Sequence, residues 1–277
     1  MMRNKIVLLL ILIEITLFLF LESPRTIILF FFFGTLYTYI SNLLRRKTIF
    51  YTKKEKTNQF VINYLIITLL GQLVALSYYN SYGEYFAPFG DDSLYFQQAI
   101  TYFPNFFQFD KLSLTSFLNH SLYSIISLVK NPNVLDLLCS HWGLAALINV
   151  FALDIACEFN KSKVHLNNLY LGVFSQAAYY FAMLSFYRDT YAILFMALSI
   201  YFSLHQRNLP SIAFALVAGL IRGANGFYAL FFHTLNYIIK KNIFKIYTSK
   251  TMFWSILTSL ILLLSIPKVQ EFIINRS

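Results

Sequence analysis

Long apolar runs separated by short polar segments are the main feature of the sequence. The runs lie at about 6–21, 26–44, 60–79, 134–156 and 169–187, then from there to 204, and at 211–221, 227–239 and 252–266. Because about 20 apolar residues are needed to cross a bilayer as a helix, most of these runs predict membrane spans and some are short or re-entrant. We therefore expect an all-α fold, a polytopic bundle of about eight membrane segments that forms a single transmembrane domain over 1–277.

Composition supports a membrane location and excludes a nucleic-acid partner. Hydrophobic residues make up 58% of the chain and charged residues 12%, which is typical of polytopic membrane proteins. The net charge of +10 would favour nucleic-acid binding in a soluble protein, but here most of the excess lies in short loops between apolar runs. We expect an integral, multi-pass protein of a bacterial inner or plasma membrane, with membrane lipid as a partner.

The positions of basic residues predict how the chain crosses the membrane. The loop after the second run holds six basic residues and one acid, from Arg45 to Lys56, so the positive-inside rule places it in the cytoplasm. The next span then delivers residues 80–133 to the non-cytoplasmic side. This predicted outer loop contains two amphipathic or short apolar stretches, 94–103 and 116–129, which we expect to form helices lying in the membrane interface.

Several polar side chains fall inside the predicted spans. Glu14 is costly in lipid and should face protein. Asp136 and Asp154 lie near opposite ends of the fourth span, where we expect them to extend to water. His141 and Asn149 should bond to neighbouring helices.

Adjacent carboxylates follow the third span, in a protein that otherwise avoids acid. Asp91 and Asp92 lie between Pro88-Phe89-Gly90 and an amphipathic stretch. One interpretation is a helix start, with Asp91, Asp92 or Ser93 as the cap. The other is a catalytic or metal-binding carboxylate on the outer face of a membrane enzyme, because a carboxylate can act as a general base toward a hydroxyl.

Three further charged residues are predicted on the same side. Arg188 and Asp189 lie at an outer turn, where they form either a local ion pair or part of a binding site. Arg222 lies between two apolar stretches that are each too short to span. The stretches form either a hairpin whose tip, with Arg222, lies below the outer surface, or one long helix. Basic residues at both ends, Arg207 and the lysines from Lys240, favour the hairpin. Arginines bind phosphate with two parallel hydrogen bonds, so Arg188 and Arg222 are candidate phosphate-binding residues.

The order of these motifs resembles the GT-C class of integral-membrane glycosyltransferases. Residues 89–95 are similar to the Gly-Asp-Ser-x-x-Tyr stretches of bacterial surface-polysaccharide proteins, residues 185–189 to their Ser-x-x-Arg-Asp step, and residues 219–222 to their Gly-Leu-x-Arg. The resemblance covers roughly residues 60–240. The chain is short for this class, and several members have Asp-Glu or Glu-x-Asp in place of Asp91-Asp92.

The resemblance implies a transferase that takes a sugar from a polyprenyl-linked donor, at the outer face, to a glycan or lipid-linked acceptor. Asp91 and Asp92 would then be catalytic, and Arg188, Asp189 and Arg222 would bind the substrate. No metal-type cysteine and histidine spacing appears in the sequence, although the carboxylates leave a divalent metal cofactor open. The alternatives are a surface-polysaccharide polymerase and a non-enzymatic transporter or assembly partner. Charges on one face count against transport.

Overall fold

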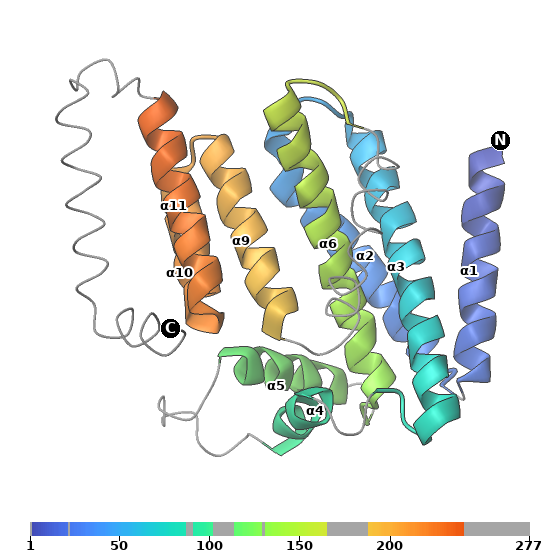
Figure 1. Ribbon diagram of the computed structural model, residues 1–277. Coiled ribbons are helices and arrows are strands. Elements are labelled where there is room, and N and C mark those ends of the chain that lie inside the picture. The colour runs from blue at the N-terminus through green and yellow to red at the C-terminus, as the bar shows by residue number, and fades with distance from the viewer. Residues whose placement is uncertain are drawn as a thin grey trace. The chain divides into compact units, whose positions relative to one another are not determined.

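The structure is a computed structural model that describes residues 2–21, 23–86, 91–101, 114–128, 131–164 and 188–240. Within these ranges it contains nine α-helices, one short 3-10 helix and no strand, which confirms the all-α prediction (Figure 1). The helices are α1 (Met2–Phe20), α2 (Thr26–Leu44), η1 (Arg45–Lys47), α3 (Lys53–Tyr82), α4 (Asp91–Thr101), α5 (Leu114–Ser127), α6 (Val134–Asn160), α9 (Arg188–Leu204), α10 (Asn208–Ile221) and α11 (Gly223–Lys240).

Three of the described helices are long and apolar enough to cross a membrane, as expected of a membrane protein. They are Thr26–Lys47, Lys53–Tyr82 and Val134–Asn160. Three shorter apolar helices accompany them, Val7–Phe20, Asp189–Leu204 and Asn208–Ile221. The runs predicted at 169–187 and 252–266 lie outside the described residues.

The start of α3 is set by a capping residue, whereas α2 follows its apolar run. α2 covers the predicted 26–44, whereas α3 begins at Lys53 rather than at 60. Thr52 explains the early start, since its hydroxyl accepts a hydrogen bond from the backbone N–H of Glu55, and the Glu55 carboxylate accepts one from the Thr52 N–H in return. This reciprocal capping box satisfies backbone donors that a helix start leaves without partners.

The core of the described bundle is built around α6, which packs against α2, α3 and α9 (Figure 1). Trp142, in the first half of α6, is fully buried. Gly71 of α3 makes room for it, because a Cβ atom there would lie 2.3 Å from the indole ring. Such a contact is far inside normal packing distance, so α3 can approach α6 this closely only at a glycine.

The chain reverses direction at Arg222, which has extended backbone between α10 and α11. A Cβ atom on Gly226 would lie only 2.4 Å from the Cα atom of Gly219. In one continuous helix, residues seven apart would be about two turns, or ~10 Å, from each other. The two stretches therefore form a hairpin, the first of the two arrangements that the sequence left open.

The chain divides into two compact units, Met1–Leu230 and Phe231–Ser277. The boundary falls within α11, and the described part of the second unit is the second half of this helix. The charged groups considered below lie in the first unit.

The two carboxylates near the ends of α6 are buried rather than exposed to water. Asp136 and Asp154 are fully buried, so the expectation that they extend to water is wrong. Asp154 accepts hydrogen bonds from Arg45, and Asp136 accepts one from Thr26 at 2.8 Å. Neighbouring helices therefore supply partners that replace water.

The other polar groups predicted inside the spans also lie within the bundle. Glu14 is fully buried and faces protein as expected, and its carboxylate has no hydrogen-bond partner among the described residues. Asn149 donates to Asn63 of α3 at 3.4 Å, which confirms the expected bond between helices. His141 contacts the ring of Tyr191 on α9 and bonds to the Leu137 carbonyl oxygen of its own helix at 3.0 Å.

Candidate active site at the α9 and α10–α11 end

Several of the predicted site residues meet where α9 begins and the α10–α11 hairpin turns. Arg222, at the turn, forms an ion pair with Asp189, the second residue of α9. The two residues are far apart in sequence, and the structure brings their side chains into direct contact through Nη1 of Arg222 and Oδ1 of Asp189. Sequence alone had placed them only on the same side.

The pair is open to solvent and leaves part of the guanidinium free. The Arg222 side chain is 45% exposed and the Asp189 side chain 25%. Arginine has five N–H donors, and no hydrogen bond from Nε or Nη2 of Arg222 reaches another described residue. An anionic oxygen can therefore bind the free edge while Asp189 holds the other.

Tyr95 of α4 lies close enough to Arg222 to affect its pKa. The hydrogen bond and the charge of Asp189 raise the pKa of Arg222, and nearby Tyr95 raises it further. Asp91 precedes Tyr95 by four residues, so the two positions share one face of α4. Asp91 therefore begins the helix that carries Tyr95, one turn away from it.

Two side-chain contacts fix the start of α9 relative to its neighbours. The Tyr191 hydroxyl donates to Oδ1 of Asn119 on α5 at 2.8 Å. The Tyr191 ring also packs edge-on against His141 of α6, with 5.2 Å between ring centroids. All three residues are buried. Because Asp189 is two residues before Tyr191, these contacts hold the acidic partner of Arg222 in place.

α5 joins α4 to the same framework. His120 of α5 bonds to the carbonyl oxygen of Ala99 at 2.7 Å, and the Ser116 hydroxyl donates to Gln98 at 2.5 Å. Figure 1 shows α4 and α5 packed together beside the ends of α9 and α10. The two stretches that were predicted to be helical in this loop are helices. Their bounds are Asp91–Thr101 and Leu114–Ser127 rather than 94–103 and 116–129.

For the other predicted site residues, the structure describes backbone position only. Asp91 and Asp92 are the first two residues of α4, and Arg188 is the first residue of α9. Among the described side chains, no three from His, Cys, Asp and Glu come together as a metal site would need. Tyr95, which is part of the 89–95 motif but was not among the predicted site residues, lies near Arg222.

No protein-family model, curated protein or solved structure matches this chain. What supports a function is therefore the chemistry of the charged groups themselves and their position relative to the apolar helices.

Proposed function

We propose that this chain is a multi-pass membrane glycosyltransferase of about eight segments that takes a sugar from a polyprenyl-phosphate donor at the non-cytoplasmic face. The observation that carries the proposal is the exposed Arg222–Asp189 pair, whose guanidinium keeps free donors beside α4. A donor of this kind has a phosphate at the membrane surface, where a partly satisfied arginine at a hairpin tip can bind it.

Each residue then has a role in the transfer. Asp91 or Asp92 accepts the proton of the acceptor hydroxyl, whose oxygen forms a bond to the anomeric carbon of the sugar. The bond from that carbon to the phosphate oxygen breaks, and the leaving polyprenyl phosphate gains negative charge. Arg222 and Arg188 stabilise this charge, and Asp189 orients Arg222.

Charge distribution supports the outer location of the site. The opposite end of α2 and α3 carries the basic loop, with Arg46, Lys47, Lys53 and Lys54 all exposed. Basic loops are retained in the cytoplasm. α6 runs from the Thr26 end of α2, where Asp136 lies, to the Arg45 end, where Asp154 lies. α9 runs back, because its Tyr201 bonds to Thr48 near the basic loop, and this leaves Asp189 at the other end.

Substitution at the carboxylates tests the chemistry. Asn keeps the shape of Asp and its capping ability but cannot act as a base. We expect either Asp91→Asn or Asp92→Asn to abolish sugar transfer from a radiolabelled polyprenyl-phosphate sugar, with unchanged protein level. Lys54→Gln, an exposed charge at the opposite end, is the control. Full transfer in both Asn variants and in the double variant contradicts the proposal.

Labelling with an impermeant thiol reagent tests the topology separately. Ser81 and Ala224 are exposed near the proposed outer face, and Lys54 is exposed in the basic loop. Ser81→Cys and Ala224→Cys should react in intact cells, and Lys54→Cys should react only after lysis. The natural cysteines, Cys139 and Cys157, are fully buried and give little background. Labelling in the opposite sense moves the site to the cytoplasm and removes the lipid-carrier argument.

A further inference from the structure

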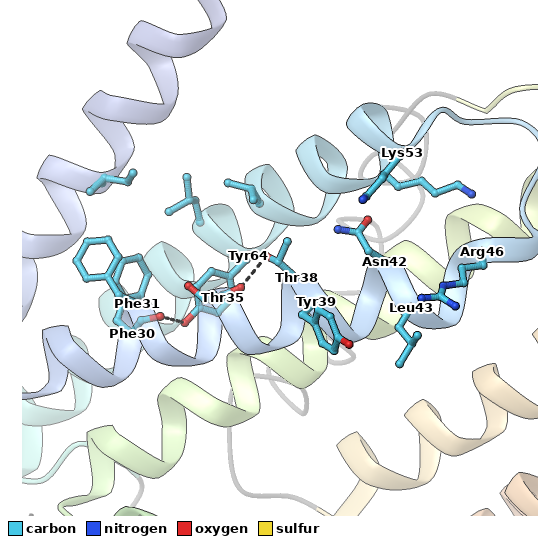
Figure 2. Close-up of a pocket in the computed structure, with 15 residues that line it drawn as sticks. Phe30, Phe31, Thr35, Thr38, Tyr39, Asn42, Leu43, Arg46, Lys53 and Tyr64 are labelled. Atoms are coloured by element: carbon cyan, nitrogen blue, oxygen red, sulfur yellow. Dashed lines mark hydrogen bonds between the residues drawn. The ribbon is translucent and has the colours of Figure 1, made fainter. Parts of the chain in front are cut away.

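A long groove lies between α2 and α3, away from the Arg222 site. It encloses a cavity of about 730 Å³, with Ile11 of α1 among the residues that line it (Figure 2). Pockets that bind small molecules usually measure about 300–1,000 Å³. The groove is therefore large enough for a ligand of ordinary size.

The groove changes from apolar to basic along its length. Phe30 and Phe31 line one end, and Arg46 and Lys53 line the other. Side chains of α2 line the groove between these two ends (Figure 2). Phe30 and Arg46 are sixteen positions apart, which is about 24 Å along α2 and the start of η1. One leaflet of a bilayer contributes about half of a ~30 Å hydrocarbon core. The groove thus matches one leaflet together with its headgroup region.

The basic end carries charge that nothing in the described chain neutralises. Arg46 and Lys53 are exposed, and neither forms an ion pair with a described residue. The residues lining the groove include no carboxylate. Glu55, the one acid in this loop, caps α3 and pairs with Lys163 instead. The mouth of the groove therefore holds at least two free cations.

Buried contacts hold this mouth open in a fixed shape. Lys56 is buried, and its Nζ donates to the carbonyl oxygens of Arg45 and Thr48 at 2.7 and 2.6 Å. Arg45 donates in return to the carbonyl oxygen of Lys56 at 3.3 Å. These bonds join η1 and Thr48 to the first turn of α3, the two elements that carry Arg46 and Lys53 at the groove. The site is preorganised, which reduces the entropy lost on binding.

We propose that the groove binds one anionic phospholipid, with an acyl chain along α2 and the phosphate between Arg46 and Lys53. Charge complementarity selects this occupant, because a zwitterionic headgroup would place a second positive charge beside these cations. The basic loop is on the predicted cytoplasmic side, where anionic lipids attract juxtamembrane lysines and arginines. The proposal is independent of the sugar-transfer function and concerns a different part of the molecule.

Lipid titration of the purified, delipidated full chain tests the charge requirement. Native mass spectrometry would measure the binding of phosphatidylglycerol and of phosphatidylcholine. Each basic residue near a headgroup is worth about fivefold in affinity. We expect Arg46→Gln/Lys53→Gln to lower phosphatidylglycerol affinity about 25-fold, and phosphatidylcholine to bind weakly throughout.

The matched control is Lys47→Gln/Lys54→Gln, which removes the same charge from adjacent residues that do not line the groove. We expect a change below about twofold in this control. Equal loss in both double variants, or equal binding of the two lipids by the natural chain, contradicts the proposal.

A filled groove tests where the acyl chain lies. Thr35 lines the groove, and Leu36 lies next to it on α2 without lining it, 38% exposed. Thr35→Trp should abolish phosphatidylglycerol binding, and Leu36→Trp should leave it intact. Unchanged binding in a folded Thr35→Trp protein contradicts binding in the groove. If that protein does not fold, the charge variants described above test the proposal instead. Displacement of phosphatidylglycerol by a lower concentration of polyprenyl phosphate also overturns the assignment, in favour of the carrier lipid.

Discussion

Two arginine–aspartate pairs lie at opposite ends of the described bundle, and they differ in nearly every physical respect. Arg45 and Asp154 are both fully buried, and two nitrogens of the guanidinium bond to two carboxylate oxygens at 2.7 and 2.8 Å. Arg222 and Asp189 are partly exposed and share one contact. Residue type alone therefore does not separate a structural ion pair from a binding site.

The difference lies in how completely each pair is satisfied. Arg45 also donates to Gln59 at 2.8 Å, and Asp154 also accepts from the Thr48 hydroxyl at 2.8 Å. The Thr48 hydroxyl in turn bonds to Tyr201 at 3.2 Å. A pair bonded on all sides and out of water has no atoms left for a ligand. The Arg222 pair keeps such atoms, so it is the better candidate for function.

Removal of one member of the buried pair should have the largest effect. Asp154→Ala leaves the Arg45 guanidinium buried without its counterion, which costs about 3–5 kcal/mol. We expect a large drop in the thermal unfolding midpoint of the detergent-solubilised protein, or loss of the protein from the membrane.

The double variant Arg45→Met/Asp154→Leu is the control for that substitution. Removal of both charges by apolar residues of similar size is often neutral or stabilising, so this variant should recover part of the loss. A stable Asp154→Ala protein would show that the buried pair does not hold the helices together.

The second buried carboxylate should give the next effect. Thr26→Val removes the hydroxyl that donates to Asp136 and keeps the side-chain shape. Hydrogen bonds to charged groups contribute about 1.5–3 kcal/mol, so we expect unfolding to become easier by about this amount in denaturant titration. Thr35→Val, at an exposed position of the same helix, should change stability little. Equal losses of stability in Thr26→Val and Thr35→Val would show that the hydrogen bond to Asp136 does not stabilise the fold.

Gly226→Ala tests whether the hairpin positions Arg222. The new methyl group would overlap the Gly219 backbone, and overpacking of this kind costs about 1–3 kcal/mol. We expect the helices to separate and any sugar transfer to fall, measured by thermal unfolding and by the transfer assay. Gly223→Ala is the control, because a Cβ atom there has nothing within 4 Å. A well-folded, fully active Gly226→Ala protein would contradict the close packing.

Arg222→Gln should have the smallest effect on stability of these variants. Exposed ion pairs contribute about 0–1 kcal/mol, so the unfolding midpoint should barely move. Sugar transfer should nevertheless be lost, because Gln cannot stabilise a phosphate as a cation does. A loss of stability as large as that of Asp154→Ala would make the Arg222 pair structural as well.

The positions of most described helices can be predicted from the local sequence. The apolar run at 26–44 coincides with α2, and the run at 134–156 predicted all but the last turn of α6. The early start of α3 was also readable, because Thr52 and Glu55 have the spacing of a capping box. Apolar runs and caps are local signals, so one stretch of chain carries all the information that they need.

Which charged groups are buried and which remain open depends on tertiary packing. Asp154 resembles Asp189 in sequence, with apolar residues close by, yet its environment is set by Arg45 and Thr48, more than a hundred residues away. The contact between Asp189 and Arg222 likewise depends on a hairpin that the local pattern left open. The free energy of a charge depends on its neighbours in space, and packing brings those neighbours together from distant parts of the chain.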